Sequence, residues 1–386
     1  MSPIDDVDRY LESCHTTFAD RPETHRIALY ASLADRERHT AVHLYRLAGA
    51  CLDGGSVALW TRGVRLAFTY PHDTRRALFE RREARIRLGE WAGWQDLAFR
   101  EDDPDFQKDN LSCPPGGYTW WDGTEDLSGK SLRIIDVGGY GDSIMWLRFV
   151  ESLHDRVAGR IYWDVDPVLT ECLQNNISHL PRIELIPWTE PGDFDRYLSA
   201  TSLPSVLGML PSFSRWTAHR MALPPTRNGA ARIGLAWACS TTGVDHLERS
   251  IPLGVLAPFF WRDDLEMYSL QVGERAPDAY CYPNVRRPEP PLQSFNDTAR
   301  WMVSLDGIIA IDTSVAHLAG ILGVPTLLLL RFACDRRWGL DDTTPWYPSV
   351  RLIRQRDPGD WLSVRPPVEE ALNMRWWEQS AGVRVV

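Results

Sequence analysis

The sequence has little of several features that would assign it to a class at once. No two of its seven cysteines lie close together, so it has neither a CxxC pair nor a disulfide framework, and we expect reduced thiols and a cytoplasmic location. The longest apolar stretch, Leu318 to Leu330, is interrupted by two glycines and a proline and is too short to span a bilayer. The start, MSPIDDVDRY, is acidic and lacks an apolar segment, so we expect no signal peptide.

The chain also lacks an excess of positive charge. Lys and Arg number 42 against 52 Asp and Glu, a net charge of −10, which disfavours binding of nucleic acid over the whole surface. With 44% hydrophobic and 24% charged residues among 386, the composition is that of a globular protein and excludes a disordered chain, a collagen-like repeat and a coiled coil. The 17 tryptophans suit either a packed core or a surface that binds sugars.

The first 100 residues are predicted to be helical. Apolar residues recur there at helical spacings, and no run alternates as a strand does. We expect one helix at about 56–70 and another at 74–88, with a third beginning in GEWAGWQDLAFR. A helix pair cannot bury its own apolar faces, so these helices must pack on neighbours. Residues 101–130 are acidic, rich in turn residues and contain proline, which indicates a connector.

From residue 131 the pattern changes to alternating strands and helices. A patternless break at about 200–230 divides this region into two series, which predicts two doubly wound parallel sheets. Ligands bind such sheets at the carboxyl ends of the strands. We expect strands at residues 132–137, 160–164, 182–187, 233–237, 265–272, 307–311 and 326–330, and a helix at 313–322.

The first loop of chemical interest is VGGYGDSIMW, which follows a predicted strand. Its glycines allow the backbone to approach a ligand closely, but the spacing is neither the dinucleotide fingerprint nor a Walker loop. A carboxylate, Asp142, stands where a phosphate would otherwise bind. It is either the cap of the following helix or a general base.

Two further loops carry polar residues at strand ends. In AIDTSVAHLAG, Asp312 ends a strand, Thr313 and Ser314 begin a helix, and His317 lies one turn further on the same face. Hydroxyls and backbone N–H groups would hold a phosphate there. In WACSTTGVDHLERSIP, Arg249 is either a surface residue or the cation that neutralises a diphosphate.

These loops resemble those of glycosyltransferase family 9, the ADP-heptose:lipopolysaccharide heptosyltransferase family. GGYGDSIMWLRFV resembles its G-x-G-D-x-I-x-x-x-R-Y segment, and IDTSVAHLAGILGVPTLLLL resembles its D-T-x-x-x-H-L-A-x-x-L-G-x-P motif. RFACDRRWGLDDTTPWYPSVRLIRQRDPGDW and the entry WWDGTEDLSGKSL resemble a branch in which tetratricopeptide helices precede the heptosyltransferase-like unit. The resemblance covers roughly residues 56–365.

The resemblance implies a GT-B fold, with two Rossmann-like domains facing across a cleft after a degenerate tetratricopeptide-like region. The acceptor domain would span 131–225, the donor domain 231–365, and a C-terminal helix 366–386. It also implies an inverting transfer from a nucleotide sugar to an acceptor hydroxyl, without metal or cofactor, and Asp142 as the catalytic base. The implied donor-side residues are Gly141, Ser240, Arg249, Gln271, Asp312, Thr313, Ser314 and His317, and the implied acceptor-side residues are Gly139 and Tyr140.

Other interpretations remain open at this point. The chain could be a catalytically altered GT-B protein that serves as a binding or assembly module, or a sugar-nucleotide epimerase on the same scaffold. The sugar and the nucleotide are left open. So is the acceptor, which could be a glycan, a protein, a natural product or a modified base. A homo-oligomer formed through the helical region is also left open.

Overall fold

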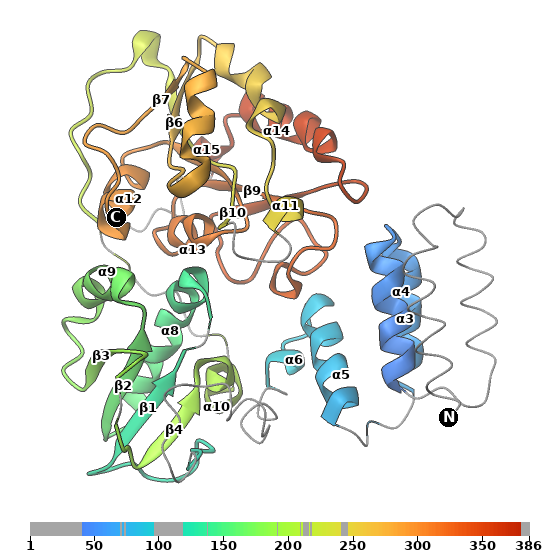
Figure 1. The fold of residues 1–386 in the computed structure, drawn as a ribbon, viewed down its shortest axis with the longest axis vertical. Coiled ribbons are helices and arrows are strands. Elements are labelled where there is room, and N and C mark those ends of the chain that lie inside the picture. Colours follow the sequence, from blue (N-terminus) through green and yellow to red (C-terminus); the bar gives the residue numbers. More distant parts are fainter. Residues whose placement is uncertain are drawn as a thin grey trace. The chain divides into compact units, whose positions relative to one another are not determined.

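The computed structural model describes residues 41–69, 72, 75–95, 119–136, 138–190, 192–208, 210, 216, 218–240 and 246–379. The chain divides into two compact units. The first contains the helices up to residue 96 together with two later segments, 332–340 and 356–359. The second contains the rest of the chain, including both β-sheets (Figure 1).

The first unit is built from short helices, as the sequence predicts. Its described helices are α3 (Ala41–Asp53), α4 (Val57–Ala67), α5 (Arg75–Arg87) and α6 (Ala92–Gln95). Ser56 caps α4 by accepting a hydrogen bond from the Leu59 backbone N–H at 3.3 Å, which satisfies one of the unpaired donors of the first turn. The expected helices 56–70 and 74–88 are therefore confirmed, whereas residues 1–40 of the expected helical region lie outside the described residues.

The apolar face of these helices is completed by a loop that the sequence assigned to the second sheet domain. Phe332 belongs to the same buried cluster as Leu44 and Trp60. Arg87 donates to the backbone carbonyl of Cys334 at 2.8 Å, and Arg336 pairs with Glu83 at 2.7 Å. A small helical array has too little core of its own, so burial of Phe332 contributes apolar area that the helices alone do not supply.

The first β-sheet belongs to the second unit and precedes the other sheet along the chain. Its strands are β1 (Ser131–Ile135), β2 (Arg160–Val165), β3 (Ile183–Pro187) and β4 (Arg196–Ser199). Among the described residues they pair in parallel in the order β3-β2-β1-β4. That is the order of the first four strands of a Rossmann sheet. The associated helices are α8 (Tyr140–Arg156), α9 (Pro167–Ile177) and α10 (Leu203–Leu207).

The second sheet repeats this order with six strands in the described region. Its strands are β5 (Ala231–Ala236), β6 (Leu265–Ser269), β7 (Val285–Arg286), β8 (Gly307–Ile311), β9 (Thr326–Leu330) and β10 (Val350–Arg354). The sheet order β10-β9-β8-β5-β6-β7 is the complete Rossmann order read from the other edge. Its helices are α11 (His246–Arg249), α12 (Phe295–Met302), α13 (Ser314–Ile321), α14 (Arg365–Asn373) and α15 (Trp376–Gln379). The prediction of two Rossmann-like domains in succession is confirmed.

Several elements differ from the expectation. Strands β4, β7 and β10 were not predicted, and β4 lies at the start of the region that the sequence left patternless. The expected helix 366–386 is two helices in its described part, because the chain turns at Arg375, whose φ of +49° ends α14. No helix in the described part of the chain combines the length and the apolar character needed to cross a membrane.

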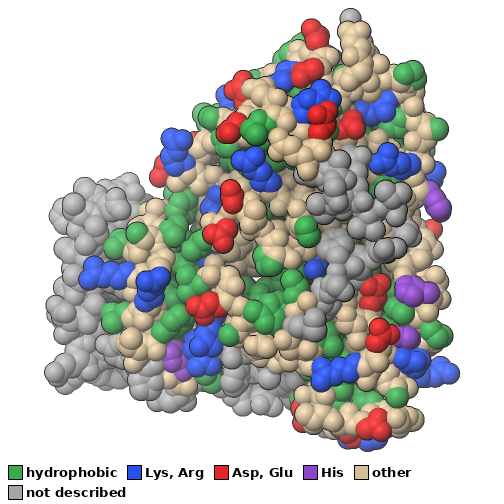
Figure 2. Space-filling model, turned by 180° about the vertical axis from the view of Figure 1, so that it is seen from behind, with side chains coloured by type: hydrophobic (Ala, Val, Ile, Leu, Met, Phe, Trp, Pro, Cys, Tyr) green, Lys and Arg blue, Asp and Glu red, His purple; other side chains and the backbone are tan. Residues whose placement is uncertain are grey.

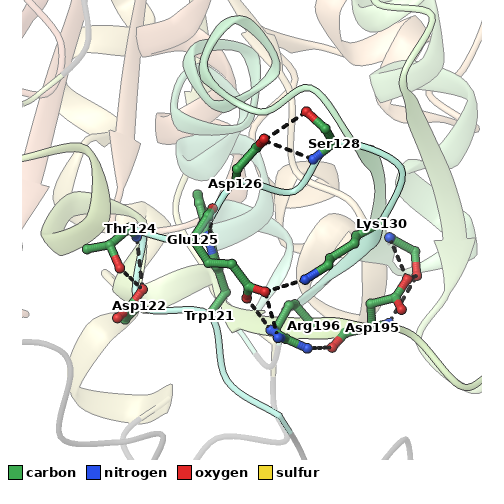
Figure 3. A network of polar contacts seen from close by, with 10 residues as sticks. Trp121, Asp122, Thr124, Glu125, Asp126, Ser128, Lys130, Asp195 and Arg196 are labelled. Atoms are coloured by element: carbon green, nitrogen blue, oxygen red, sulfur yellow. Dashed lines mark hydrogen bonds and ion pairs between the residues drawn. The ribbon is translucent and has the colours of Figure 1, made fainter.

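The end of the connector is joined to the first sheet. Trp120 forms a parallel bridge with Tyr197 of β4, through hydrogen bonds from Trp121 to Tyr197 and from Tyr197 to Thr119. Figure 3 shows Glu125 accepting from Arg196 of β4 and from Lys130 beside it. The hydrogen bonds from Lys130 and Arg196 hold the pKa of the Glu125 carboxyl below its usual range. Residues 119–130 are therefore part of the first Rossmann-like domain and not a free linker.

Candidate active site

The segment Gly138–Asp142 contains the end of the connection from β1 and the first three residues of α8, of which Asp142 is the third. Gly139 is the N-cap of α8, and its backbone N–H donates to Asp142 Oδ2 at 2.8 Å. A side chain at 138 would begin 2.4 Å from Asp142 Cβ, so the loop closes on Asp142 only because residue 138 is glycine. The predicted capping role of Asp142 is therefore present. The carboxylate is also only partly buried and lies at the ligand edge of the sheet.

A second carboxylate, Asp136, lies next to this loop and was not predicted. It directly follows β1, and its Oδ1 accepts from the Gly138 N–H at 3.2 Å, while a further hydrogen bond comes from Ser143. Burial raises the pKa of the Asp136 carboxyl to about 7, and the nearby charge of Asp142 acts in the same direction. The sequence did contain a signal for Asp136, because a polar residue at the end of a buried strand lies where ligands bind such sheets.

The second loop places His317 in a buried setting. Thr313 is the N-cap of α13, with its hydroxyl 3.4 Å from the Ile311 carbonyl, and its side chain makes no capping hydrogen bond. His317 is 3% exposed, and its Nδ1 lies 2.8 Å from the hydroxyl of Tyr347, which is fully buried. The two rings meet edge to face, with centroids 5.7 Å apart. A loop thirty residues away in sequence thus sets the orientation of the imidazole.

The segments VGGYGDSIMW and AIDTSVAHLAG come into contact through Gly141 and His317. A Cβ atom added at residue 141 would stand 2.6 Å from His317 Cδ2 and 3.3 Å from Nε2, so only glycine lets the imidazole lie there. Helices α8 and α13 are neighbours, as Figure 1 also shows. Tyr140 adds a second contact between the domains through its edge-to-face packing on Phe295 of α12, with centroids 5.6 Å apart. Gly141, the residue before Asp142, therefore contacts His317 of the other Rossmann-like domain.

Arg249, from the segment WACSTTGVDHLERSIP, contacts Asp312. The guanidinium of Arg249 donates to the Asp312 carbonyl at 2.6 Å and lies 3.9 Å from its carboxylate. Its neighbour Glu248 pairs with Arg331, which directly follows β9, at 2.5 Å. Two contacts therefore hold α11 against the carboxyl ends of β8 and β9, beside the N-terminus of α13.

Gln271 has a different environment from the one expected of a ligand contact. Its Oε1 accepts from the backbone N–H groups of Trp237 and Ala238, and its Nε2 donates to the carbonyls of Ala238 and Val272, all at 2.9–3.0 Å. Its amide therefore fixes the backbone after β5, from which the exposed Ser240 follows. Any effect of Gln271 on a ligand is exerted through that backbone.

The surface charge fits the acidic composition. On the face seen in Figure 2, basic and acidic side chains are interspersed and do not gather into a stripe of one sign. Within the described residues, no three His, Cys, Asp or Glu side chains are grouped so that they could hold a metal ion.

Comparison with known proteins gives one curated relative and several solved structures. Protein FlbA of Caulobacter vibrioides is 23% identical over 289 residues, which are 65% of this chain and 48% of FlbA, so the match spans about half the length of that relative. No protein-family model matches the sequence.

The similar solved structures include members of glycosyltransferase family 9. The family 9 glycosyltransferase of Veillonella parvula has a TM-score of 0.48 and 14% identity, covering 67% of this chain and 100% of the other. ADP-heptose lipopolysaccharide heptosyltransferase II of E. coli has a TM-score of 0.44 and 13% identity, covering 65% and 100%. The iron-containing dodecameric glycosyltransferase TibC of enterotoxigenic E. coli has a TM-score of 0.44 and 12% identity, covering 57% and 63%.

Proposed function

We propose that this chain is a glycosyltransferase that moves a sugar from a nucleotide-sugar donor to an acceptor hydroxyl, with inversion and without metal. The observation that carries this proposal is the meeting of Gly141 and His317. It brings the first turn of α8, which contains Asp142, against His317 of α13, a helix that begins at the ligand edge of the second Rossmann-like sheet. Two Rossmann-like domains that share one site suit a reaction with two substrates.

In this reaction Asp142 acts as the general base. An inverting transfer needs one group to take the acceptor proton as the hydroxyl attacks the anomeric carbon. The Asp142 carboxylate keeps its position through the hydrogen bond from the Gly139 backbone N–H. Gly139 and Tyr140 would line the acceptor side.

The second domain supplies the stabilisation of the departing diphosphate. The side chain of the N-cap residue Thr313 makes no capping hydrogen bond to α13, and Thr313 and Ser314 provide hydroxyls beside the N–H groups of its first turn. Arg249 adds a positive charge next to Asp312. Helix N–H groups and a guanidinium are suited to the charge that develops on a diphosphate leaving group. Gln271 would act indirectly, by holding the backbone that leads to Ser240.

One observation favours a second candidate, a binding or assembly module without catalysis. The hydrogen bond between Asp142 and Gly139 is what a helix-capping residue makes, and capping alone needs no chemistry. The two candidates differ in turnover and not in ligand affinity. An epimerase would require additional catalytic acids, and no observation on the further carboxylate of this loop, Asp136, assigns it such a role.

The test is a screen of nucleotide sugars by thermal shift, followed by assay of the stabilising compounds for donor hydrolysis and transfer. A donor that stabilises the protein and is turned over supports the glycosyltransferase. A donor that stabilises it but stays intact over a long incubation supports the binding module. If no nucleotide sugar or nucleoside diphosphate stabilises the protein, both candidates are wrong.

A further inference from the structure

The helical unit and the unit that holds both sheets are joined by more than one stretch of chain. The chain passes from one unit to the other after residues 96, 331, 340, 355 and 359. The two segments that return to the helices, 332–340 and 356–359, follow the neighbouring strands β9 and β10. They leave these strands at the carboxyl ends, the edge at which Rossmann-like sheets bind ligands. The helical unit is therefore completed by loops from the ligand edge of the second sheet.

The segment 332–340, here called the anchor segment, is held firmly in the helical unit. Phe332 is buried in the apolar cluster that α3, α4 and α5 form. Arg336 pairs with Glu83 of α5 at 2.7 Å, and the two side chains are 30% and 20% exposed. The loop after β10 is held there as well, because a Cβ atom at Gly55 would stand only 3.1 Å from the Pro358 ring. Moving the anchor segment would expose apolar area and separate a partly buried ion pair.

The anchor segment begins directly after a contact of the proposed donor edge. Arg331, the residue before Phe332, pairs with Glu248 of α11 at 2.5 Å. Glu248 precedes Arg249, whose guanidinium donates to the Asp312 carbonyl at 2.6 Å. An ion pair at the surface is weak by itself, so its geometry depends on how firmly each of its residues is held.

The backbone of Arg331 is fixed from both sides. Leu330 before it is the last residue of β9 and accepts from the Gln355 N–H at 2.9 Å. Phe332 after it is buried among the helices. Consecutive Cα atoms are about 3.8 Å apart, so Arg331 cannot move far while both neighbours keep their places.

We propose that the anchor segment positions Arg331 and, through Glu248, holds α11 so that Arg249 stays at the end of β8. Phe332 and Arg336 are then positioning residues that act on the donor edge through the chain itself. The effect on α11 needs no ligand, whereas the effect on a bound nucleotide rests on the proposed function.

The first test measures amide hydrogen exchange of the full chain without ligand, from milliseconds to hours. Phe332→Ala removes the apolar contact of the anchor segment, and Arg336→Met, a milder change, removes its ion pair. In both variants we expect faster exchange in residues 332–340 and also in residues 246–251, which contain α11, with the strands of the first sheet unchanged. Exchange in 246–251 that stays at the wild-type rate while 332–340 opens would overturn the proposal.

Tyr45→Phe is the control for a general loosening of the helices. It removes a hydrogen bond of the helical unit, from the Tyr45 hydroxyl to His72 Nε2 at 2.8 Å, and keeps the ring in the apolar cluster. We expect exchange in 246–251 to stay at the wild-type rate in this variant. An equal acceleration in Tyr45→Phe and Phe332→Ala would show that the anchor segment has no special effect on α11, and the proposal would be wrong.

The second test measures nucleotide affinity by calorimetry with ADP, GDP, UDP and CDP. Phe332→Ala should weaken the nucleotide that binds about 2- to 30-fold, the range for changes that act on a ligand through intervening residues. Phe332→Leu, which keeps an apolar side chain in the cluster, should restore most of the affinity. In protein that already carries Arg249→Ala, Phe332→Ala should have little further effect. Fully additive losses would show that the anchor segment does not act through Arg249.

The two tests separate this proposal from the proposed function. If none of the four nucleotides binds the wild type while the anchor variants accelerate exchange in α11, the proposed function is wrong and the positioning of α11 stands. If a nucleotide binds Phe332→Ala as tightly as the wild type and exchange in α11 is unchanged, the helical unit is an independent module and the positioning role is wrong.

Discussion

The imidazole of His317 lies against the backbone of Gly141, so closely that a Cβ at residue 141 would stand 2.6 Å from its Cδ2. One residue begins the first Rossmann-like domain's helix α8, and the other belongs to α13 of the second. This contact links the loop that holds Asp142 to the helix whose N-terminus faces Arg249 and Asp312.

Gly141→Ala should destabilise the protein and displace His317. The alanine methyl has no space beside a buried imidazole, and overpacking of this kind costs about 1–3 kcal/mol. Gly49→Ala in α3 is the control, because a Cβ at that helical position meets nothing within 4 Å. Urea denaturation of both variants measures the difference. Equal free energies of unfolding would mean that the contact between Gly141 and His317 is not tight in solution.

Asp142→Asn should abolish sugar transfer while leaving donor affinity nearly unchanged. The amide oxygen can still accept from Gly139, and Asn caps a helix about as well as Asp, so the fold is kept. Without a base, transfer should fall about 10²–10⁴-fold, in kcat. Asp166→Asn, at the N-cap of α9, is a control for the capping role alone. A folded Asp142→Asn variant with near-normal turnover would mean that Asp142 only caps α8.

Arg249→Ala should weaken the binding of a nucleoside diphosphate by about 1.5–3 kcal/mol, the usual value of a hydrogen bond to a charged group. Arg249 lies at the carboxyl end of β8 through its contact with Asp312. Arg262→Ala is the control, since that arginine precedes β6 and pairs with Asp264 at 2.8 Å. Calorimetry with the four nucleoside diphosphates compares the two variants. Equal affinities would assign Arg249 to holding α11 and not to the ligand.

Asp136→Asn should make the protein more stable relative to wild type as the pH rises. Burial raises the folded-state pKa of Asp136 from 3.8 to about 7, so folding favours its protonated form. The stability that this group contributes is full below pH 3.8 and is lost as the pH rises to about 7. The amide stays neutral throughout. The advantage of the variant should therefore grow between about pH 4 and pH 7 and then level off. Unfolding curves that stay parallel over this range would show that Asp136 is ionised in the folded protein.

Much of the architecture could be read from local sequence. Buried strands of parallel sheets are continuous apolar runs, so GIIAI and TLLLL gave β8 and β9 at their observed bounds. Capping residues marked helix starts, as Ser56 and Asp166 do. Strands β4 and β7, which the sequence did not predict, lie at the edges of their sheets. Strand β7 has two residues and β4 has four, and strands this short carry too little periodicity to be recognised.

The sequence by itself determined the two βα series and the polar loops at their strand ends, because both depend on short-range patterns of apolar, capping and glycine residues. Only the tertiary structure decided which of those loops meet. It placed His317 against Gly141, Arg249 on Asp312 and the amide of Gln271 on the backbone of Trp237 and Ala238. It also brought Tyr347 to His317, although no local signal connects the two. Such contacts join residues far apart in the chain, and they follow from how the domains pack and not from the spacing of residues along either one.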